Sequence, residues 1–196
     1  MNHKFSEKVG LTRWSSNSNL VFNQAILDGD VTKVKFLLKY CSQNLSLNDL
    51  NNRGMTPLQQ SCCNSNLQIV TLLLDHGADM EKADDEGQTA LHMAVMANSI
   101  KIAKFLIDSC ANLTAMDSKG RFPIDLAVDV KMVVFLAKEM TAQGYEETAR
   151  MYMEKWGLIA PKPDDDDFEG PLSPVSFYDD NSSDESPSKE NKMDFT

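Results

Sequence analysis

Few residues in this 196-residue chain have the types and spacing that catalysis or metal binding requires. The three histidines, His3, His76 and His92, stand at no metal-ligand spacing from the cysteines, and no GxSxG or HExxH motif occurs. The nine glycines are dispersed, so the sequence has no glycine-rich phosphate loop. We therefore expect no catalytic residue, no bound metal and no cofactor, and we predict that the protein is not an enzyme.

The cysteines and the charge indicate the setting in which the protein works. Cys41, Cys62, Cys63 and Cys110 form no CxxC pair, which favours reduced thiols in a cytoplasmic or nuclear protein. The net charge is −10, of which residues 161–196 contribute −8 (11 Asp and Glu against 3 Lys), and this argues against a nucleic-acid partner. No apolar run approaches the roughly 20 residues that span a bilayer, so we expect no membrane association.

The acidic C-terminal stretch differs in composition from the rest of the chain. From residue 161 onward it is rich in proline, serine and acidic residues, including four aspartates at 164–167. Such a segment cannot bury enough apolar surface to offset the entropy of ordering, so we predict a disordered tail over 161–196. Ser173 and Ser186 precede prolines and Ser182 stands three residues before a glutamate, which makes them candidate phosphorylation sites.

An internal repeat organises the middle of the chain. Gly54, Gly87 and Gly120 are spaced 33 apart, and the residues after them align as Met-Thr-Pro-Leu, Gln-Thr-Ala-Leu and Arg-Phe-Pro-Ile. Thr56 and Thr89 are suited to cap a helix, because a threonine hydroxyl can accept from backbone N–H groups. Each unit predicts a turn, a short helix, a second turn and a longer helix, with glycine supplying positive φ in the first turn.

These motifs resemble the ankyrin repeat, whose signature is a 33-residue period and a TPLHxA-like start of the first helix. The best copy is TALHMA at 89–94, in which His92 is placed to hydrogen-bond between neighbouring turns. Gln59 and Asp125 replace this histidine in the preceding and following units. The resemblance implies an all-α ankyrin-repeat solenoid of helix-turn-helix units with hairpin-like turns, and a scaffold or adaptor that binds another protein.

The repeat register predicts how the chain is divided. We expect a flexible N-terminal segment over 1–18, an ankyrin domain over 19–140 and a C-terminal helix over 141–160. About four units make up the domain, at 19–51, 52–84, 85–117 and 118–140, of which the first and last are degenerate capping units. The last segment carries a helical stripe formed by Tyr145, Ala149, Tyr152 and Trp156. This stripe predicts either a helix that covers the end of the array or a free amphipathic element that awaits a partner groove.

In ankyrin domains the turn tips and the exposed face of the first helix line a concave groove. The register assigns to this groove Asn52, Arg53, Met55, Cys63, Asn64, Asp85, Glu86, Gln88, Met96, Ala97, Ser118, Lys119 and Arg121. The groove is acidic in the middle and basic at its end. We expect a monomer whose partner sets a basic patch against Asp85 and Glu86, while Met55 and Met96 give adaptable apolar contact.

Two short segments raise a more specific interpretation. The repeats are similar to those of the ankyrin-containing regulatory subunits of type-1 protein phosphatase, and also to other small ankyrin adaptors. In those subunits a docking motif precedes the first repeat; here Thr12, Arg13 and Trp14 occupy that place, with Thr12 where Val or Ile is usual. Residues 33–36 (KVKF) also spell a basic-Val-x-Phe motif, but we assign its valine and phenylalanine to the helical core. The alternative function is a regulatory or targeting subunit of that phosphatase.

Overall fold

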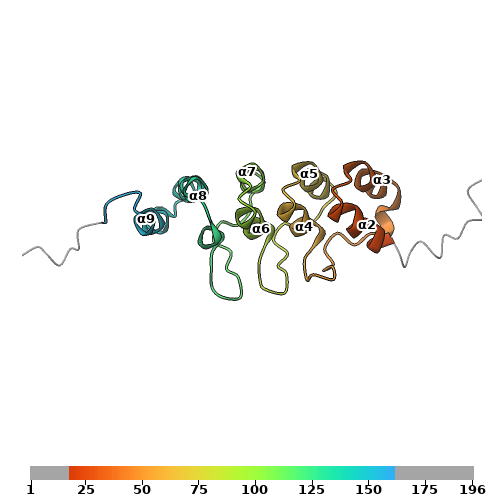
Figure 1. Ribbon diagram of the computed structural model, residues 1–196, viewed down its shortest axis with the longest axis horizontal. Helices are drawn as coiled ribbons and strands as arrows, with labels where there is room; N and C mark the ends of the chain where they lie inside the picture. Colours follow the sequence, from red (N-terminus) through yellow and green to blue (C-terminus); the bar gives the residue numbers. More distant parts are fainter. Residues whose placement is uncertain (1–17, 162–196) are drawn as a thin grey trace, which may run out of the picture. The chain divides into compact units, whose positions relative to one another are not determined.

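The computed structural model describes residues 18–161, which form a row of stacked helix pairs (Figure 1). No strand occurs in this part of the chain, which confirms the all-helical solenoid. The elements are α2 (Ser18–Leu27), α3 (Val31–Cys41), η1 (Ser42–Asn44), α4 (Pro57–Cys63), α5 (Leu67–Asp75), α6 (Ala90–Met96), α7 (Ile100–Asp108), η2 (Pro123–Leu126), α8 (Val130–Ala142) and α9 (Glu146–Lys155). The first unit is α2–α3, the second α4–α5, the third α6–α7 and the fourth η2–α8.

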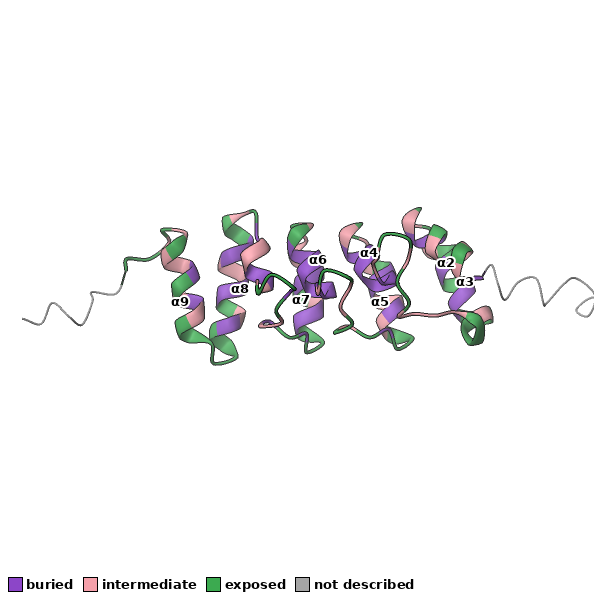
Figure 2. Ribbon diagram, turned by 90° about the horizontal axis from the view of Figure 1, so that it is seen from below, coloured by how far each residue is buried: buried purple, intermediate pink, exposed green. Residues whose placement is uncertain are grey.

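The units stack in two layers. Helices α2, α4 and α6 lie beside one another in one layer and continue into the 3-10 helix η2, while α3, α5, α7 and α8 form the second layer (Figure 1). Buried residues occur in the helices along the whole row, from α2 to α9 (Figure 2), and form one core cluster. No single unit could bury its apolar face alone, so the core is continuous from the first unit to the last.

Local capping fixes where the helices begin. The Thr56 hydroxyl accepts from the backbone N–H of Gln59 (3.2 Å), and the Gln59 side chain accepts from the backbone N–H of Thr56 (2.7 Å). This reciprocal pair is a capping box, which satisfies two N–H groups that a helix N-terminus leaves without partners. At α3 and α5 the side chains of Asp30 and Asn66 each accept from one backbone N–H of the first turn, without the reciprocal bond. The predicted cap at Thr56 is therefore confirmed.

The C-terminal end of the array differs from its expected boundary. Helix α8 continues to Ala142 and ends where Gly144 takes a φ of +89°, so α8 extends two residues past the expected end of the array at residue 140. Helix α9 packs on α8 and buries Ala149 and Tyr152, while Tyr145 stays exposed. The stripe is thus partly covered by the array and is not a free amphipathic element.

The position of Phe36 in the first unit differs from the expected one. Val34 of the KVKF motif is fully buried, but Phe36 is 57% exposed, so Phe36 is not a core residue as expected. It lies on the side of α3 that no other unit covers within residues 18–161. The start of α2 at Ser18 also places that residue in the array and not in the N-terminal segment. None of the helices between residues 18 and 161 has the length and apolar character needed to cross a bilayer.

Candidate protein-binding groove

The turn tips of the second, third and fourth units are each held by one side chain at the same position of the repeat. In the third unit, Asp84 Oδ1 accepts from the backbone N–H groups of Glu86 (2.9 Å) and Gln88 (2.8 Å). Asn51 and Asp117 make the equivalent pairs of bonds in the neighbouring turns. An Asx side chain of this kind fixes the turn without help from the rest of the fold. The intervening side chains therefore project from a rigid base.

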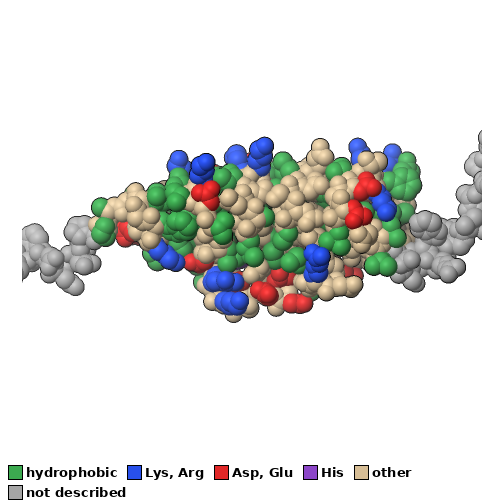
Figure 3. Space-filling view, in the orientation of Figure 1, with side chains coloured by type: hydrophobic (Ala, Val, Ile, Leu, Met, Phe, Trp, Pro, Cys, Tyr) green, Lys and Arg blue, Asp and Glu red, His purple; other side chains and the backbone are tan. Residues whose placement is uncertain are grey.

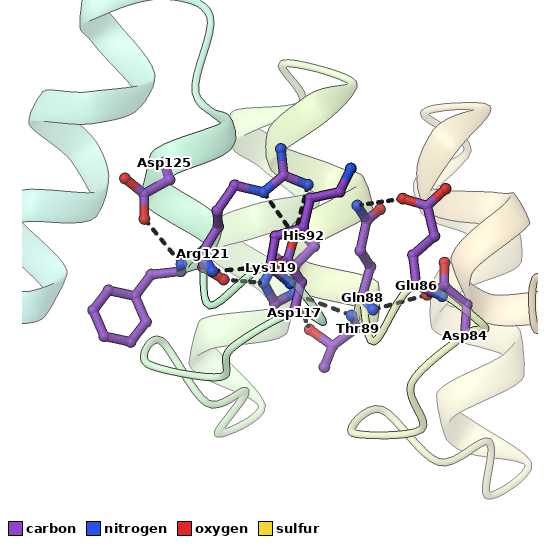
Figure 4. Close-up of polar contacts among 10 residues, drawn as sticks. Asp84, Glu86, Gln88, Thr89, His92, Asp117, Lys119, Arg121 and Asp125 are labelled. Carbon is purple, nitrogen blue, oxygen red and sulfur yellow. Dashed lines mark hydrogen bonds and ion pairs between the residues drawn. The ribbon is translucent and has the colours of Figure 1, made fainter.

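A second recurring position links the second unit to the third and the third unit to the fourth. Gln59 Nε2 donates to the carbonyl of Gln88 at 2.7 Å. In the following unit His92 Nδ1 accepts from the backbone N–H of Thr89 (3.1 Å), so the ring proton is on Nε2, which donates to the carbonyl of Arg121 (3.3 Å; Figure 4). This is the bond between turns that the sequence predicted for His92. Burial lowers the pKa of His92, which keeps the ring neutral as both bonds require.

The turn tips also touch one another directly. The backbone N–H of Ser118 donates to the carbonyl of Glu86 at 2.9 Å. Gly87 has a φ of +77°, and a Cβ built there would lie 2.7 Å from the Ser118 backbone nitrogen. Only glycine permits both this conformation and this approach. The third and fourth turns are therefore locked side by side.

A groove lies between the turn that begins the second unit and the turn that begins the third unit; these are called the second and third turns. Its volume is about 370 Å³, and its lining residues are Arg53, Gly54, Met55, Cys63, Asp84, Asp85, Glu86, Gln88, Met93 and Met96. Three methionines provide a polarisable apolar surface that can adapt to different side chains. The carboxylates of Asp84, Asp85 and Glu86 lie on the third turn, and the guanidinium of Arg53 lies on the second. Figure 3 shows the charges along the turn tips as a basic, an acidic and again a basic group.

The structure brings together seven of the residues that the sequence assigned to the groove. Arg53, Met55, Cys63, Asp85, Glu86, Gln88 and Met96 all line it. Gln88 is a correction in one respect, since it is only 4% exposed and its Nε2 donates to Glu86 Oε2 at 3.4 Å. Met96, in contrast, is 48% exposed and offers the largest apolar contact. Burial of Gln88 leaves it a supporting role at the base of the turn.

The remaining assigned residues lie elsewhere. Asn52 lines a separate hollow of about 230 Å³ with Arg53 and Leu20. The side chain of Asn64 donates to the carbonyl of Ile26 at 3.1 Å and so ties the second unit to the first. Ala97 is the C-cap residue of α6. A residue at a repeat position that faces the groove in other units can therefore hold the fold together instead of contacting a partner.

The basic end of the row is partly engaged in the fold. The Arg121 guanidinium forms an ion pair with Asp117 (Nη2 to Oδ2, 2.7 Å), whose side chain is almost fully buried. Desolvation opposes ionisation of Asp117, but hydrogen bonds from Arg121 and Lys119 prevail and lower its pKa to about 2. Lys119 and Ser118 are exposed at the tip of the same turn. Lys119 is therefore the cation of this turn that is free to meet a partner.

Sequence reasoning missed several residues of these surfaces. Met93 and Asp84 line the main groove, and Leu27 of α2 lines the smaller hollow. The sequence did contain a sign that Leu27 belongs to a groove. Asp30 and Asn66 are the caps of α3 and α5, and the residues three positions before them, Leu27 and Cys63, are therefore equivalent. A constant spacing of 33 residues aligns Leu27 with Gln60 instead, so the groove was not carried into that unit.

Other sequence predictions fall outside the described residues. They include the phosphatase-docking candidates Thr12, Arg13 and Trp14, the phosphorylation candidates Ser173, Ser182 and Ser186, and the disordered tail. Within residues 18–161 no group of three or more His, Cys, Asp or Glu side chains is placed to hold a metal ion. All four cysteines are free thiols.

Comparison with known proteins adds two findings. A family model described as ankyrin repeats (three copies) matches residues 22–117 and 77–149. The transient receptor potential channel pyrexia of Drosophila melanogaster is 39% identical over 70 residues, which is 36% of this chain and 7% of the channel. The chain thus spans a small part of that relative's length, and the likeness concerns one segment and not the activity of the channel.

Proposed function

The chain belongs to the ankyrin-repeat family and is a protein–protein interaction module, and we propose that it is a non-enzymatic scaffold or adaptor that holds its partner in the groove between the second and third turns. The observation that carries the proposal is the composition of this groove. Methionines line it, Met96 is half exposed, and Asp85 forms no ion pair within residues 18–161. A partner side chain buried in this groove would contact the methionines, and a basic group beside it would pair with Asp85.

The partner chemistry follows from the charges on the turn tips. Asp85 and Glu86 stand between Arg53 on one side and Lys119 on the other. A complementary partner presents a basic group flanked by acidic ones, with a long apolar side chain entering among the methionines. Charges at a rim mainly set the association rate and the selectivity. We therefore expect association to slow when salt is raised from 50 to about 300 mM, because the Debye length shortens.

The test is co-purification of partners from cells, followed by quantitative mass spectrometry. The double variant Asp85→Arg/Met96→Arg reverses the charge and blocks the apolar surface without removing a buried side chain. The matched control is Lys104→Glu/Lys131→Glu on α7 and α8, which also replaces two exposed side chains and alters the net charge, in the other direction. We expect partners to be lost with the groove variant and kept with the control. If every partner remains bound to the groove variant, the groove is not the site.

A regulatory subunit of type-1 protein phosphatase is the second proposal, and only Thr12, Arg13 and Trp14 support it. The KVKF segment does not, because Val34 is fully buried in α3 and a folded helix cannot dock as an extended strand. Titration of the full chain with the purified catalytic subunit tests this proposal. Binding that is weakened by Trp14→Ala supports it, while no binding, or binding indifferent to that change, refutes it.

We further propose a reducing compartment, cytoplasm or nucleus, as the location of the protein. Four free thiols, of which Cys110 is exposed, support this proposal, since exposed thiols persist where glutathione keeps them reduced. Fractionation of cells that express the tagged chain tests it, and recovery in the secretory pathway would contradict it.

A further inference from the structure

Two aromatic side chains on the outer helix of the first unit are exposed together. Phe36 is 57% exposed and Tyr40 65% exposed, and they lie one helical turn apart on α3. Their ring centroids are 4.8 Å apart with the planes inclined by 44°. Single exposed apolar residues are common on protein surfaces, whereas a packed aromatic pair indicates a contact surface.

The repeat register explains why this pair is exposed. Residues in the same register as Phe36, namely Leu72 in α5 and Phe105 in α7, are half-buried in the array. The first unit has no unit before it within residues 18–161, so Phe36 has no such cover. Terminal repeats normally carry a polar outer face for solubility. Here the outer face keeps an aromatic residue at the position where a polar one is expected.

Lysines surround the aromatic pair. Lys33, Lys35 and Lys39 are all exposed, and α3 contains no acidic residue. At 100° per residue, the exposed positions of α3 form one continuous arc with the aromatic pair between lysines on both sides. The Lys39 ammonium lies 5.2 Å from the centre of the Tyr40 ring. We call this surface the α3 face; its residues are Lys33, Lys35, Phe36, Lys39 and Tyr40.

The charge of the α3 face indicates its occupant. Three ammonium groups around two aromatic rings complement a segment with several carboxylates and one apolar or aromatic residue. The sequence before Ser18 is itself basic, with three Lys or Arg and one Glu, so its charge does not complement the α3 face. An acidic segment of another protein carries the complementary charge.

The charges near α3 also favour a short acidic segment over an extended polyanion as the occupant of the α3 face. The turn before α3 carries exposed Asp28 and Asp30, and the whole chain has a net charge of −10. A bilayer or a nucleic acid would face these acids as well as the lysines. At 1.5 Å per residue Tyr40 lies about 15 Å along α3 from Asp30, beyond the Debye length of about 8 Å at physiological salt, so a short segment seated on the aromatic pair interacts mainly with the lysines.

We propose that the α3 face is a second docking site, which binds an acidic segment of a partner protein that carries an apolar or aromatic anchor. The site is independent of the groove between the second and third turns, since it lies on the outer layer of the first unit. With both sites, the chain can hold two proteins at once, as an adaptor does.

The experiment uses the full chain and an unbiased probe. A phage-displayed library of random dodecapeptides is panned on the immobilised protein in the presence of excess soluble Phe36→Ser/Tyr40→Ser variant. The peptide most enriched is then synthesised, labelled and titrated by fluorescence polarisation. The comparison proteins are that variant, Lys35→Glu/Lys39→Glu, and the control Lys101→Glu/Lys131→Glu on other outer helices. Vesicles of mixed phosphatidylcholine and phosphatidylserine serve as the competing polyanion.

We expect enriched peptides that are acidic and contain an aromatic or aliphatic residue. Their affinity should fall at least tenfold with either α3 variant and less than threefold with the control. Because the replaced side chains are exposed, the Tm should change by no more than about 2 °C. A larger fall in Tm would show that the chain itself covers the α3 face, and the proposal would be wrong. Enrichment of neutral or basic peptides, or no enrichment at all, would also overturn the proposal. So would a result in which no peptide binds but vesicles bind and their binding depends on Phe36.

Discussion

Gly87 and Gly120 occupy equivalent turn positions, and we predict that alanine costs far more at the first than at the second. Both residues have positive φ, +77° and +71°. A Cβ at Gly120 meets nothing within 4 Å, whereas a Cβ at Gly87 would lie 2.7 Å from the backbone nitrogen of Ser118. The pair therefore separates the conformational cost of alanine from the cost of moving a neighbouring turn.

The magnitudes follow from these two terms. An alanine at positive φ costs about 1–2 kcal/mol, and the lower entropy of its unfolded chain returns about 0.4–1 kcal/mol. Gly120→Ala should therefore lower the free energy of unfolding by about 1 kcal/mol. At Gly87 the overlap forces the Ser118 backbone away, which adds about 1–3 kcal/mol of steric strain and breaks its 2.9 Å bond to Glu86, about 1 kcal/mol. Gly87→Ala should lose about 3–5 kcal/mol.

Urea unfolding followed by far-ultraviolet circular dichroism measures both values. We expect the two variants to differ by about 2 kcal/mol or more at an unchanged m-value. A reduced m-value for Gly87→Ala would show that the array has split at the displaced turn, which the same reasoning allows. Equal losses for the two variants, within about 0.5 kcal/mol, would refute the idea that contact between turns makes Gly87 necessary.

Three further predictions concern the caps and the links between units. His92→Gln should be nearly neutral at pH 7, because glutamine makes the same two bonds in the preceding unit, while His92→Ala should lose about 3 kcal/mol in urea unfolding. Since burial lowers the pKa of His92, the unfolded state binds the proton first; stability should fall as the pH drops below about 6.5, and this fall should be smaller in His92→Gln. Tyr152→Phe removes a 2.7 Å bond to the Asp125 carboxylate and should cost about 1.5–2 kcal/mol, with faster hydrogen exchange confined to α9; uniform exchange would contradict this. Cys110 has a φ of +71° at a helix end, so Cys110→Gly should raise the Tm and stabilise the protein by about 0.5 kcal/mol, and a lower Tm would show that the cysteine is not strained.

The sequence predicted those features whose cause is local. The turn glycines recur at a constant spacing because each turn needs the same backbone, and capping at Thr56 depends on residues only three positions away. The link from His92 was predictable because its register places it beside the next turn. Local causes of this kind can be read without knowing how the units pack.

Features that depend on neighbouring units were harder to predict. Phe36 has the helical spacing of a core residue, and only the lack of a preceding unit in the described structure exposes it. Gln88 and Asn64 share register positions with recognition residues, but contacts to their neighbours occupy their side chains. Helix α8 ends at Ala142, two residues past the expected end of the array, where it packs against α9. In each case the tertiary surroundings, and not the residue's own preference, determine the outcome.

The contact between Tyr152 and Asp125 determines how the array can change in length. At the position of Gln59 and His92, the fourth unit has Asp125, whose Oδ2 accepts from the backbone N–H of Phe122 (3.0 Å) and from the Tyr152 hydroxyl (2.7 Å). In the earlier units the same position bonds the next turn, so α9 takes the place that a fifth turn would need. A repeat added after α9 would find no N–H donor at this position, because a carboxylate only accepts hydrogen bonds. Duplication or design can therefore lengthen the solenoid upstream of Asp125, but not by adding a unit after α9.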